Sequence, residues 1–260
     1  MKLEVLLSVM NLNKKDLDKM NITSKCTVIN QCGENKKEKY KNFNIYSYDE
    51  LGTANSRNRG LEHITEDIIL LCDDDVVYNK DYEKIVLEEF KKNLEADMII
   101  FNVINTYRKK RINKKNKRLH IYNSLNYAAY NVAFRKKSLG NIRMNTMFGP
   151  AAKYKSGGDD TLFIVDFLKN KLRIYSSSKI IGKIISNEST WFKGYNEKFF
   201  FDKGALYTAI SKKYRHILML QHLTRHKEIL GNLDFFKAYR LMLKGSKEYL
   251  KDKEVKKWRN

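Results

Sequence analysis

The sequence predicts an α/β protein with a mostly parallel sheet flanked by helices, followed by a basic helical extension. Apolar segments of strand length alternate with helical segments over the first hundred residues, which is the pattern of a parallel sheet. Residues 3–9 are almost continuously apolar, as strands covered on both faces usually are. From Lys203 onward, 15 basic residues stand against 5 acidic ones. We therefore expect an α/β domain over residues 1–204 and a basic helical extension over residues 205–260.

The individual strands can be placed from apolar runs that end in polar turns. They are expected at residues 3–9, 26–30, 43–48, 68–71, 98–103, 131–139 and 173–176. A helix is expected to begin near Thr53 or Asn55, either of which can cap its first turn with a side-chain oxygen. Residues 81–94 carry an apolar stripe at helical spacing, and another amphipathic helix is expected from Leu162 onward.

The composition allows one large domain, or a domain with a small appendage, because 260 residues with 42% apolar content can bury a substantial core. The net charge of +21 attracts anions such as nucleotide phosphates, nucleic acid or acidic lipid. Residues 108–118 hold eight basic residues and no acid. Such a run is usually a solvated loop, and binding of nucleic acid or acidic lipid is the alternative.

The cysteines and the hydropathy pattern indicate the cellular compartment. Cys26, Cys32 and Cys72 have no metal-binding spacing and cannot all pair, which favours a reducing, cytoplasmic setting. No apolar run approaches the roughly 20 residues that span a bilayer. The basic helices after Lys203 can contact the inner face of the cell membrane or pack onto the α/β domain.

A triplet of carboxylates, Asp73-Asp74-Asp75, ends one apolar strand. Adjacent anions repel, so the triplet is explained best by a bound cation, and Mg²⁺ or Mn²⁺ is typically held by one or two carboxylates. A solvated acidic turn is the alternative. Asn11 and Asn30 also lie at the ends of expected strands. Because ligands bind beyond the carboxyl ends of parallel strands, we expect all five side chains on one rim of the sheet.

A second pair of carboxylates, Asp159 and Asp160, follows Gly157-Gly158 at the start of a predicted helix. A carboxylate at this place can act as a general base, and a simple helix cap is the alternative. Trp191 stands among polar residues and can stack on a sugar ring, although packing in a core is commoner for tryptophan.

Two arginines, Arg57 and Arg59, occupy the first turns of the helix that follows residue 52. The helix dipole disfavours cations there, which suggests that they reach for phosphate or for the Asp triplet. Exposed arginines on a surface helix are the alternative.

Taken in order, these landmarks resemble the inverting glycosyltransferases of family 2, which have the GT-A (Rossmann-like) fold. Asp73-Asp74-Asp75 resembles the DXD motif, residues 56–59 resemble the SRNR segment, and Asp159-Asp160 stands where the family carries its ED motif. Residues 188–195 and 199–205 resemble a subset that builds bacterial capsular or other surface polysaccharides. The resemblance covers roughly residues 1–207.

The chain departs from the family pattern at two of these positions. Asp159 replaces the usual Glu of the catalytic pair, which makes the first acid one methylene shorter. Asn30 stands where the family commonly has the Asp that holds the uracil base. The choice of nucleotide is therefore open at this point.

The resemblance implies metal-dependent transfer, with inversion, from a nucleotide sugar to a hydroxyl of a surface glycan. Asp75 and Asp73 would hold Mn²⁺ or Mg²⁺ on the donor diphosphate, and Asp74 would lie against the ribose or the sugar. Asn11, Asn30 and Arg57 would frame the nucleotide. A UDP-sugar is the donor favoured.

The acceptor side follows from the same resemblance. Asp160, beside Asp159, would remove the proton of the acceptor hydroxyl, and Trp191 would line the acceptor site. The acceptor would be a glycan or a lipid-linked glycan.

Two other functions compete with this one. A nucleic-acid-binding protein would explain the net charge of +21 and the run at residues 108–118. It explains the five clustered acids poorly, because they would repel phosphate. A catalytically inactive subunit that binds a nucleotide sugar or a glycan is the other alternative.

Overall fold

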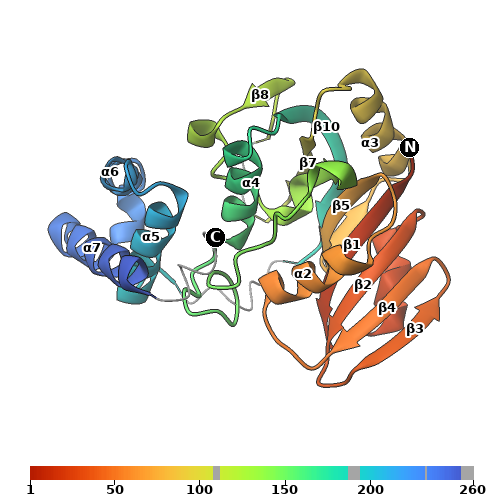
Figure 1. Cartoon of the computed structure of the whole chain (residues 1–260), viewed down its shortest axis with the longest axis horizontal. Coiled ribbons are helices and arrows are strands. Elements are labelled where there is room, and N and C mark those ends of the chain that lie inside the picture. Colours follow the sequence, from red (N-terminus) through yellow and green to blue (C-terminus); the bar gives the residue numbers. More distant parts are fainter. Residues whose placement is uncertain (108–111, 187–193, 232, 253–260) are drawn as a thin grey trace. The chain divides into compact units, whose positions relative to one another are not determined.

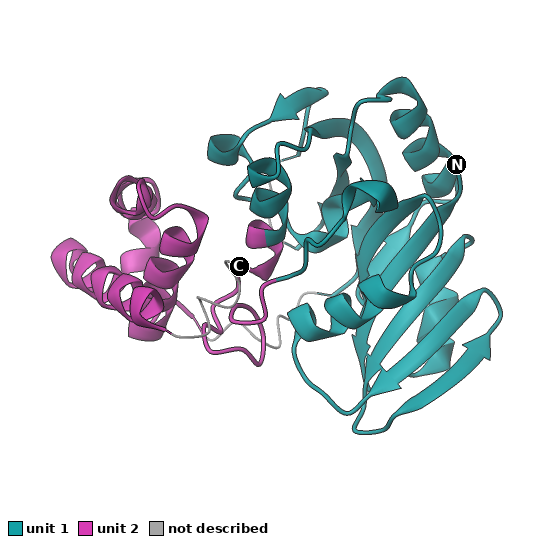
Figure 2. Cartoon of the chain, viewed as in Figure 1, with its two compact units in different colours: residues 1–144, 163–188 teal, residues 145–162, 189–260 magenta. Residues whose placement is uncertain are grey.

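A computed structural model of the chain describes residues 1–107, 112–186, 194–231 and 233–252 (Figure 1). The chain divides into two compact units, which Figure 2 colours separately: residues 1–144 with 163–188, and residues 145–162 with 189–260.

The first unit is built on a sheet of ten strands within the described residues. Their order is β3-β4-β2-β1-β5-β9-β7-β10-β6, and β8 pairs with β10 outside this path. The strands are β1 (Leu3–Met10), β2 (Lys25–Gln31), β3 (Lys36–Tyr40), β4 (Phe43–Tyr48), β5 (Ile68–Asp73), β6 (Val76–Tyr78), β7 (Met98–Asn105), β8 (Lys117–Leu119), β9 (Val132–Arg135) and β10 (Ile174–Ile184). β4, β2, β1 and β5 are parallel neighbours, and so are β7 and β10. The predicted α/β sheet flanked by helices is confirmed, but the sheet is mixed. β9 runs antiparallel to β5 and β7, and the short or edge strands β3, β6 and β8 also pair in antiparallel fashion.

Three strands were not expected from the sequence, and one is much longer than expected. β3 is a lysine-rich edge strand, and lysines are common on edges because they discourage pairing with another chain. β6 and β8 have only three residues each. β10 continues well past residue 176, and the register of its pairing with β7 shifts between Ser176 and Gly182. This irregular polar stretch hides the second half of the strand from a search for apolar runs.

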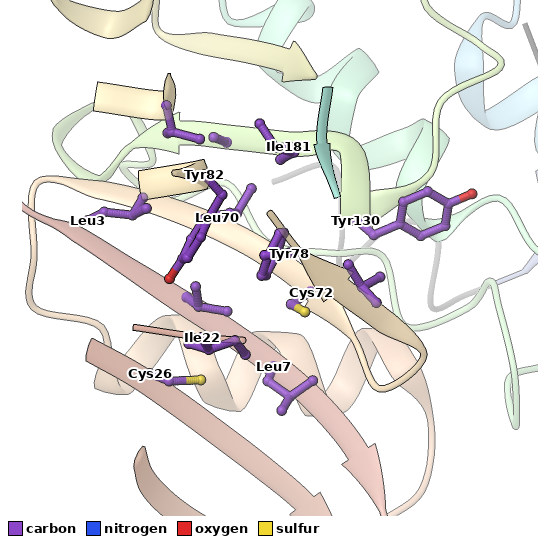
Figure 3. Close-up of a cluster of buried hydrophobic side chains, with 14 of the residues drawn as sticks. Leu3, Leu7, Ile22, Cys26, Leu70, Cys72, Tyr78, Tyr82, Tyr130 and Ile181 are labelled. Carbon is purple, nitrogen blue, oxygen red and sulfur yellow. The ribbon is translucent and has the colours of Figure 1, made fainter. Parts of the chain in front are cut away.

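Helices cover both faces of this sheet. The helices of this unit are α1 (Lys14–Leu17), α2 (Thr53–His63), α3 (Tyr82–Lys92) and the later part of α4 (Asp159–Lys169). Its 3₁₀ helices are η1 (Asp18–Met20), η2 (Ile121–Asn123), η3 (Ala129–Asn131) and η4 (Lys136–Ser138), of which η2 and η4 bury no residue. α3 packs on the face that carries Leu7, Leu70 and Cys72, where Tyr82 is fully buried (Figure 3). α2 and α4 pack on the opposite face, which carries Leu6. The alternation along β1 follows directly from the period of two in a strand.

Helix α2 lies unusually close to the sheet because of a glycine. A Cβ placed on Gly60 would come within 2.1 Å of the Leu6 side chain. The helix begins at Thr53 with Gly52 as its N-cap, and no side chain caps it. The expected capping by Thr53 or Asn55 is therefore wrong. The backbone at Gly52 has a φ of 115°, which favours glycine, and its N–H donates to Gln31 Oε1 at 2.7 Å.

The second unit contains the helices α5 (Glu197–Ile210), α6 (Arg215–Arg225) and α7 (Phe235–Lys251), and the 3₁₀ helix η5 (Lys227–Leu230). The expected division between residues 204 and 205 falls inside α5. The loop before α4 belongs with this helix: Ser156 donates to Asp202 through its N–H and its hydroxyl, at 3.1 and 2.8 Å. Within the described part of the chain, no helix is both long and apolar enough to cross a membrane.

Two glycines let α5 and α7 approach closely. A Cβ on Gly204 would lie 1.9 Å from the Met242 carbonyl oxygen, and a Cβ on Gly245 would lie 1.9 Å from the Phe201 carbonyl oxygen. Thr208 and Ser246 join the same helices by a hydrogen bond of 2.7 Å between their hydroxyls. Backbone groups rather than flexible side chains therefore fill the space beside each glycine.

Replacing Gly245 by Ala should destabilise the second unit by about 1–3 kcal/mol, because the new methyl meets a backbone carbonyl and the helices must separate. Thermal unfolding and hydrogen exchange of the α5 and α7 amides measure the effect. Lys244→Ala, at the exposed neighbouring position, is the control and should leave the stability almost unchanged. A Gly245→Ala protein as stable as the control would contradict the close packing.

Candidate functional site

The carboxyl ends of four parallel strands form one edge of the first unit. Ser8 of β1 stands opposite Asp73 of β5, and Val9 of β1 stands opposite Asn30 of β2. Asn11 directly follows β1 and has a positive φ of 51°. The register of the sheet therefore brings Asn11, Asn30 and the Asp triplet to the same edge, as the sequence predicts.

Asp73 is the last residue of β5, and Asp74 and Asp75 form the turn that leads to β6. Arg57 of α2 donates from Nη2 to Asp73 Oδ1 at 2.5 Å. The Arg57 side chain is only 3% exposed, whereas the Asp73 side chain is 31% exposed. A guanidinium this deeply buried requires a charged partner, and Asp73 supplies it.

The other two residues of the turn, Asp74 and Asp75, have different surroundings. The burial of its carboxyl and the neighbouring charge of Asp73 both raise the pKa of Asp74 above its ordinary value. The main-chain oxygen of Asp75 accepts from the Ile185 N–H at 2.9 Å, which ties the turn to the end of β10. The turn is thus fixed at both ends while its carboxylates stay close together.

Beside this turn lies a pocket of about 230 Å³ within the first unit. Its polar lining comes from Asn11, Asn13, Asp16, Lys19 and Asp74. Apolar residues of β1 and of the segment after it form the remainder, together with Ile185. The pocket therefore lies at the edge where parallel α/β sheets bind their ligands.

Each side chain of residues 56–59 makes a polar contact, and two of them, Ser56 and Arg57, connect α2 to this edge. The Ser56 hydroxyl is 2.7 Å from the Ser8 hydroxyl, and Asn58 exchanges two hydrogen bonds with the backbone of Met144. Arg57 reaches the Asp triplet, which is one of the two targets expected from the sequence. Arg59 instead donates to Glu50 at 2.8 Å, on the surface.

Asn30 is turned into the protein. Its Oδ1 accepts from the Leu12 N–H at 2.9 Å, and its Nδ2 donates to Ser47 Oγ at 3.2 Å. The residue is 8% exposed. Both ends of the amide are therefore engaged within the chain, and Asn30 holds the loop after β1 in place. Its expected contact with the nucleotide stays a prediction.

The second carboxylate pair begins α4. Gly157 and Gly158 have φ values of 79° and 120°. Both adopt backbone conformations that favour glycine, as expected from the sequence. Asp159 and Asp160 then form the first turn of the helix, where the exposed N–H groups favour negative charge. Asp159 is 5% exposed, and a Cβ on Gly149 would lie 2.8 Å from its carboxyl carbon. The backbone thus packs directly against this carboxylate.

The sequence reasoning missed Lys203 of α5, which lies close to the second pair. Burial lowers the pKa of the Lys203 ammonium to about 8, while Asp202 and Asp159 act in the opposite direction. The only signal in the sequence is a lysine among the apolar residues of this helix. Trp191 and residues 108–111 lie outside the described residues.

The described residues contain no group of three or more His, Cys, Asp or Glu side chains placed to hold a metal. The Asp73–Asp75 turn still fits an ion that takes one or two protein carboxylates and completes its shell with phosphate and water. It does not fit a metal that needs a complete cage of protein ligands.

Comparison with solved structures identifies the fold. S. aureus TarS 1-349 in complex with UDP-GlcNAc matches with a TM-score of 0.66 and 14% identity, over 96% of this chain and 81% of that one. The mannosyltransferase PcManGT from Pyrobaculum calidifontis, in complex with GDP-Man and Mn²⁺, matches with a TM-score of 0.55 and 13% identity, over 99% and 82%. The fold is that of the GT-A glycosyltransferases.

A comparison with family models adds a similarity at the level of the sequence. Residues 29–152 match the model of the family described as Glycosyl transferase family 2. The match covers 124 of the 260 residues, so the similarity to this family is established for that part of the chain. Comparison with the curated proteins gave no match.

The raised pKa of Asp74 predicts that Asp74→Asn raises stability at neutral pH. A carboxyl whose pKa is higher in the folded protein opposes folding above that pKa, and the penalty disappears as the pH falls through it. The Asp74 carboxyl is only partly buried and solvent screens its charge, so we expect a Tm gain of about 1–2 °C at pH 7 that vanishes below about pH 4. Thermal unfolding across pH measures it. An Asp74→Asn protein less stable than the parent at pH 7 would show that the ionised Asp74 carboxylate does not oppose folding.

The contacts of Asn30 predict different results for two substitutions. Asn30→Asp keeps an oxygen that accepts from the Leu12 N–H, whereas Asn30→Ala leaves this N–H without its partner and should cost about 1–3 kcal/mol. Hydrogen exchange at the Leu12 amide should accelerate in the Ala variant and stay slow in the Asp variant. Equal protection in both variants would show that the side chain does not hold this loop.

Proposed function

We propose that this protein is a metal-dependent inverting glycosyltransferase that moves a sugar from a nucleotide sugar to a hydroxyl of a surface glycan. The observation that carries the proposal is the Asp73–Asp75 turn. It lies beside a pocket at the carboxyl edge of the sheet, within the residues that match the family 2 model. The TarS and PcManGT structures contain UDP-GlcNAc and GDP-Man, which supports a nucleotide-sugar donor.

The donor would lie along this edge, with Asp74 against the ribose or the sugar and Asn11 at the nucleotide. Asn30 would act through the loop that it holds, since its amide is engaged with Leu12 and Ser47. Arg57 would face the diphosphate from α2, because its guanidinium already lies at the Asp triplet. A UDP-sugar remains the donor favoured.

Asp75 and Asp73 would hold Mn²⁺ or Mg²⁺. When bound, such an ion offsets the negative charge that builds on the leaving diphosphate. The ion pair with Arg57 fixes the Asp73 carboxylate, so one ligand would be oriented before the donor arrives. The Mn²⁺ in the PcManGT structure supports this choice of ion.

Asp160 would act as the general base. It would take the proton of the acceptor hydroxyl while the hydroxyl oxygen forms a bond to the anomeric carbon. The bond from that carbon to the diphosphate oxygen breaks on the opposite side, which inverts the configuration. Asp159, packed against Gly149, would orient the helix turn that carries the base. Trp191 would line the site of a glycan or lipid-linked glycan acceptor.

The test combines donor binding with turnover. A panel of UDP- and GDP-sugars with Mn²⁺ should raise the Tm for the true donor, and EDTA should abolish the gain. Asp160→Asn should keep this stabilisation while turnover falls by about 10²–10⁴-fold, the usual contribution of a general base. Asp166→Asn, on the same helix, is the control and should retain activity.

Each part of the proposal can fail separately. Full turnover by Asp160→Asn would exclude this residue as the base. Stabilisation that persists in EDTA would exclude the metal. Donor binding without release of free nucleotide, under every acceptor tested, would instead indicate an inactive glycan-binding subunit.

A further inference from the structure

Helix α7 has two opposite faces. The buried face carries Ala238, Met242, Gly245 and Tyr249, and it packs against α5 and its neighbours. The opposite face carries, at spacings of three or four residues, a row of exposed side chains that we call the α7 stripe: Phe236, Arg240, Lys244, Lys247 and Lys251. A span of 15 residues at the rise of an α-helix makes this row about 22 Å long.

The cations of the α7 stripe have no acidic partner within ion-pair distance among the described residues. Other lysines of the same unit do have one: Lys237 pairs with Glu197 at 2.7 Å, and Lys153 pairs with Glu248 at 3.1 Å. The glycine contact with α5 fixes which side of α7 faces the solvent. The row of four cations is therefore presented outward by the packing itself.

Apolar side chains lie among these cations. Phe236, at the start of the stripe, is 73% exposed, and Leu250, beside its end, is 37% exposed. Helices that lie on membranes combine Lys and Arg with apolar side chains that enter the boundary between headgroups and acyl chains. A nucleic-acid backbone would neutralise the cations but would leave Leu250 in water. The combination therefore favours an anionic lipid surface.

We propose that the α7 stripe docks this protein on the surface of an anionic bilayer, with Phe236 inserted at the headgroup level. Each basic side chain close to such a surface adds to the attraction, which falls off within a Debye length. The inference concerns binding and not turnover, so its failure would leave the proposed glycosyl transfer untouched.

Vesicle co-sedimentation of the full chain tests the proposal, with neutral phosphatidylcholine compared with vesicles that contain about 30 mol% phosphatidylglycerol. The variant Arg240→Gln/Lys244→Gln/Lys247→Gln should bind the anionic vesicles on the order of a hundredfold more weakly than the parent. Phe236→Ser should weaken binding several-fold. All four positions are exposed, so circular dichroism and Tm should stay unchanged.

The matched control is Lys84→Gln/Lys91→Gln/Lys92→Gln, which removes three exposed lysines from α3 of the first unit and lowers the net charge equally. This control should bind the anionic vesicles like the parent. Equal loss in the control would show a general effect of the net charge and would overturn the proposal. So would equal binding of the parent to neutral vesicles, or tighter binding to a single-stranded oligonucleotide at the same ionic strength.

Discussion

The parallel pairing of β1 with β2 and β5 is the constraint on which the rest of the first unit depends. It sets Ser8 opposite Asp73 and Val9 opposite Asn30, so side chains from distant parts of the chain meet at one edge. A shift of one residue would turn every side chain of the moved strand to the other face. Because alternate residues of β1 are buried against helices on both faces, such a shift would disrupt both clusters.

This edge concentrates charge that a stable fold would otherwise avoid. Three adjacent carboxylates repel one another, and the pKa of Asp74 is raised first by burial and then by the charge of Asp73. Arg57 offsets part of the repulsion, and its ion pair with Asp73 compensates part of the cost of burying the guanidinium. The ion pair therefore stabilises both partners. A local conflict of this kind is expected where a site is shaped for a ligand rather than for stability.

Much of this arrangement could be predicted from the sequence, because it depends on local patterns. The buried strands are apolar runs, and the residues after them reach the same edge by the geometry of parallel sheets. The engagement of Asn30 with Leu12 and Ser47 could not be predicted, since hydrogen bonds across strands depend on exact register. The same holds for Gly52, which caps α2 through its backbone conformation rather than through a side chain.

In the second unit, several contacts join segments that are far apart in the sequence, and local patterns do not predict them. The segment 145–162 carries no strong periodicity, and it joins α5 through Ser156 and Asp202 only in three dimensions. A division of the chain by composition alone therefore falls inside a helix. The sequence reasoning missed Lys203 for the same reason, because its partners Asp202 and Asp159 come together only after folding.

The distribution of charge carries more information than its total. A net charge of +21 attracts every anion weakly, and salt screens this attraction beyond about 10 Å. Selective contact requires cations in fixed positions. Arg57 is fixed by burial beside Asp73, whereas the cations of α7 are fixed by the opposite face of their helix, where Gly245 meets the backbone of α5. In both places a feature of the packing decides which positive charges can act together, and composition alone does not.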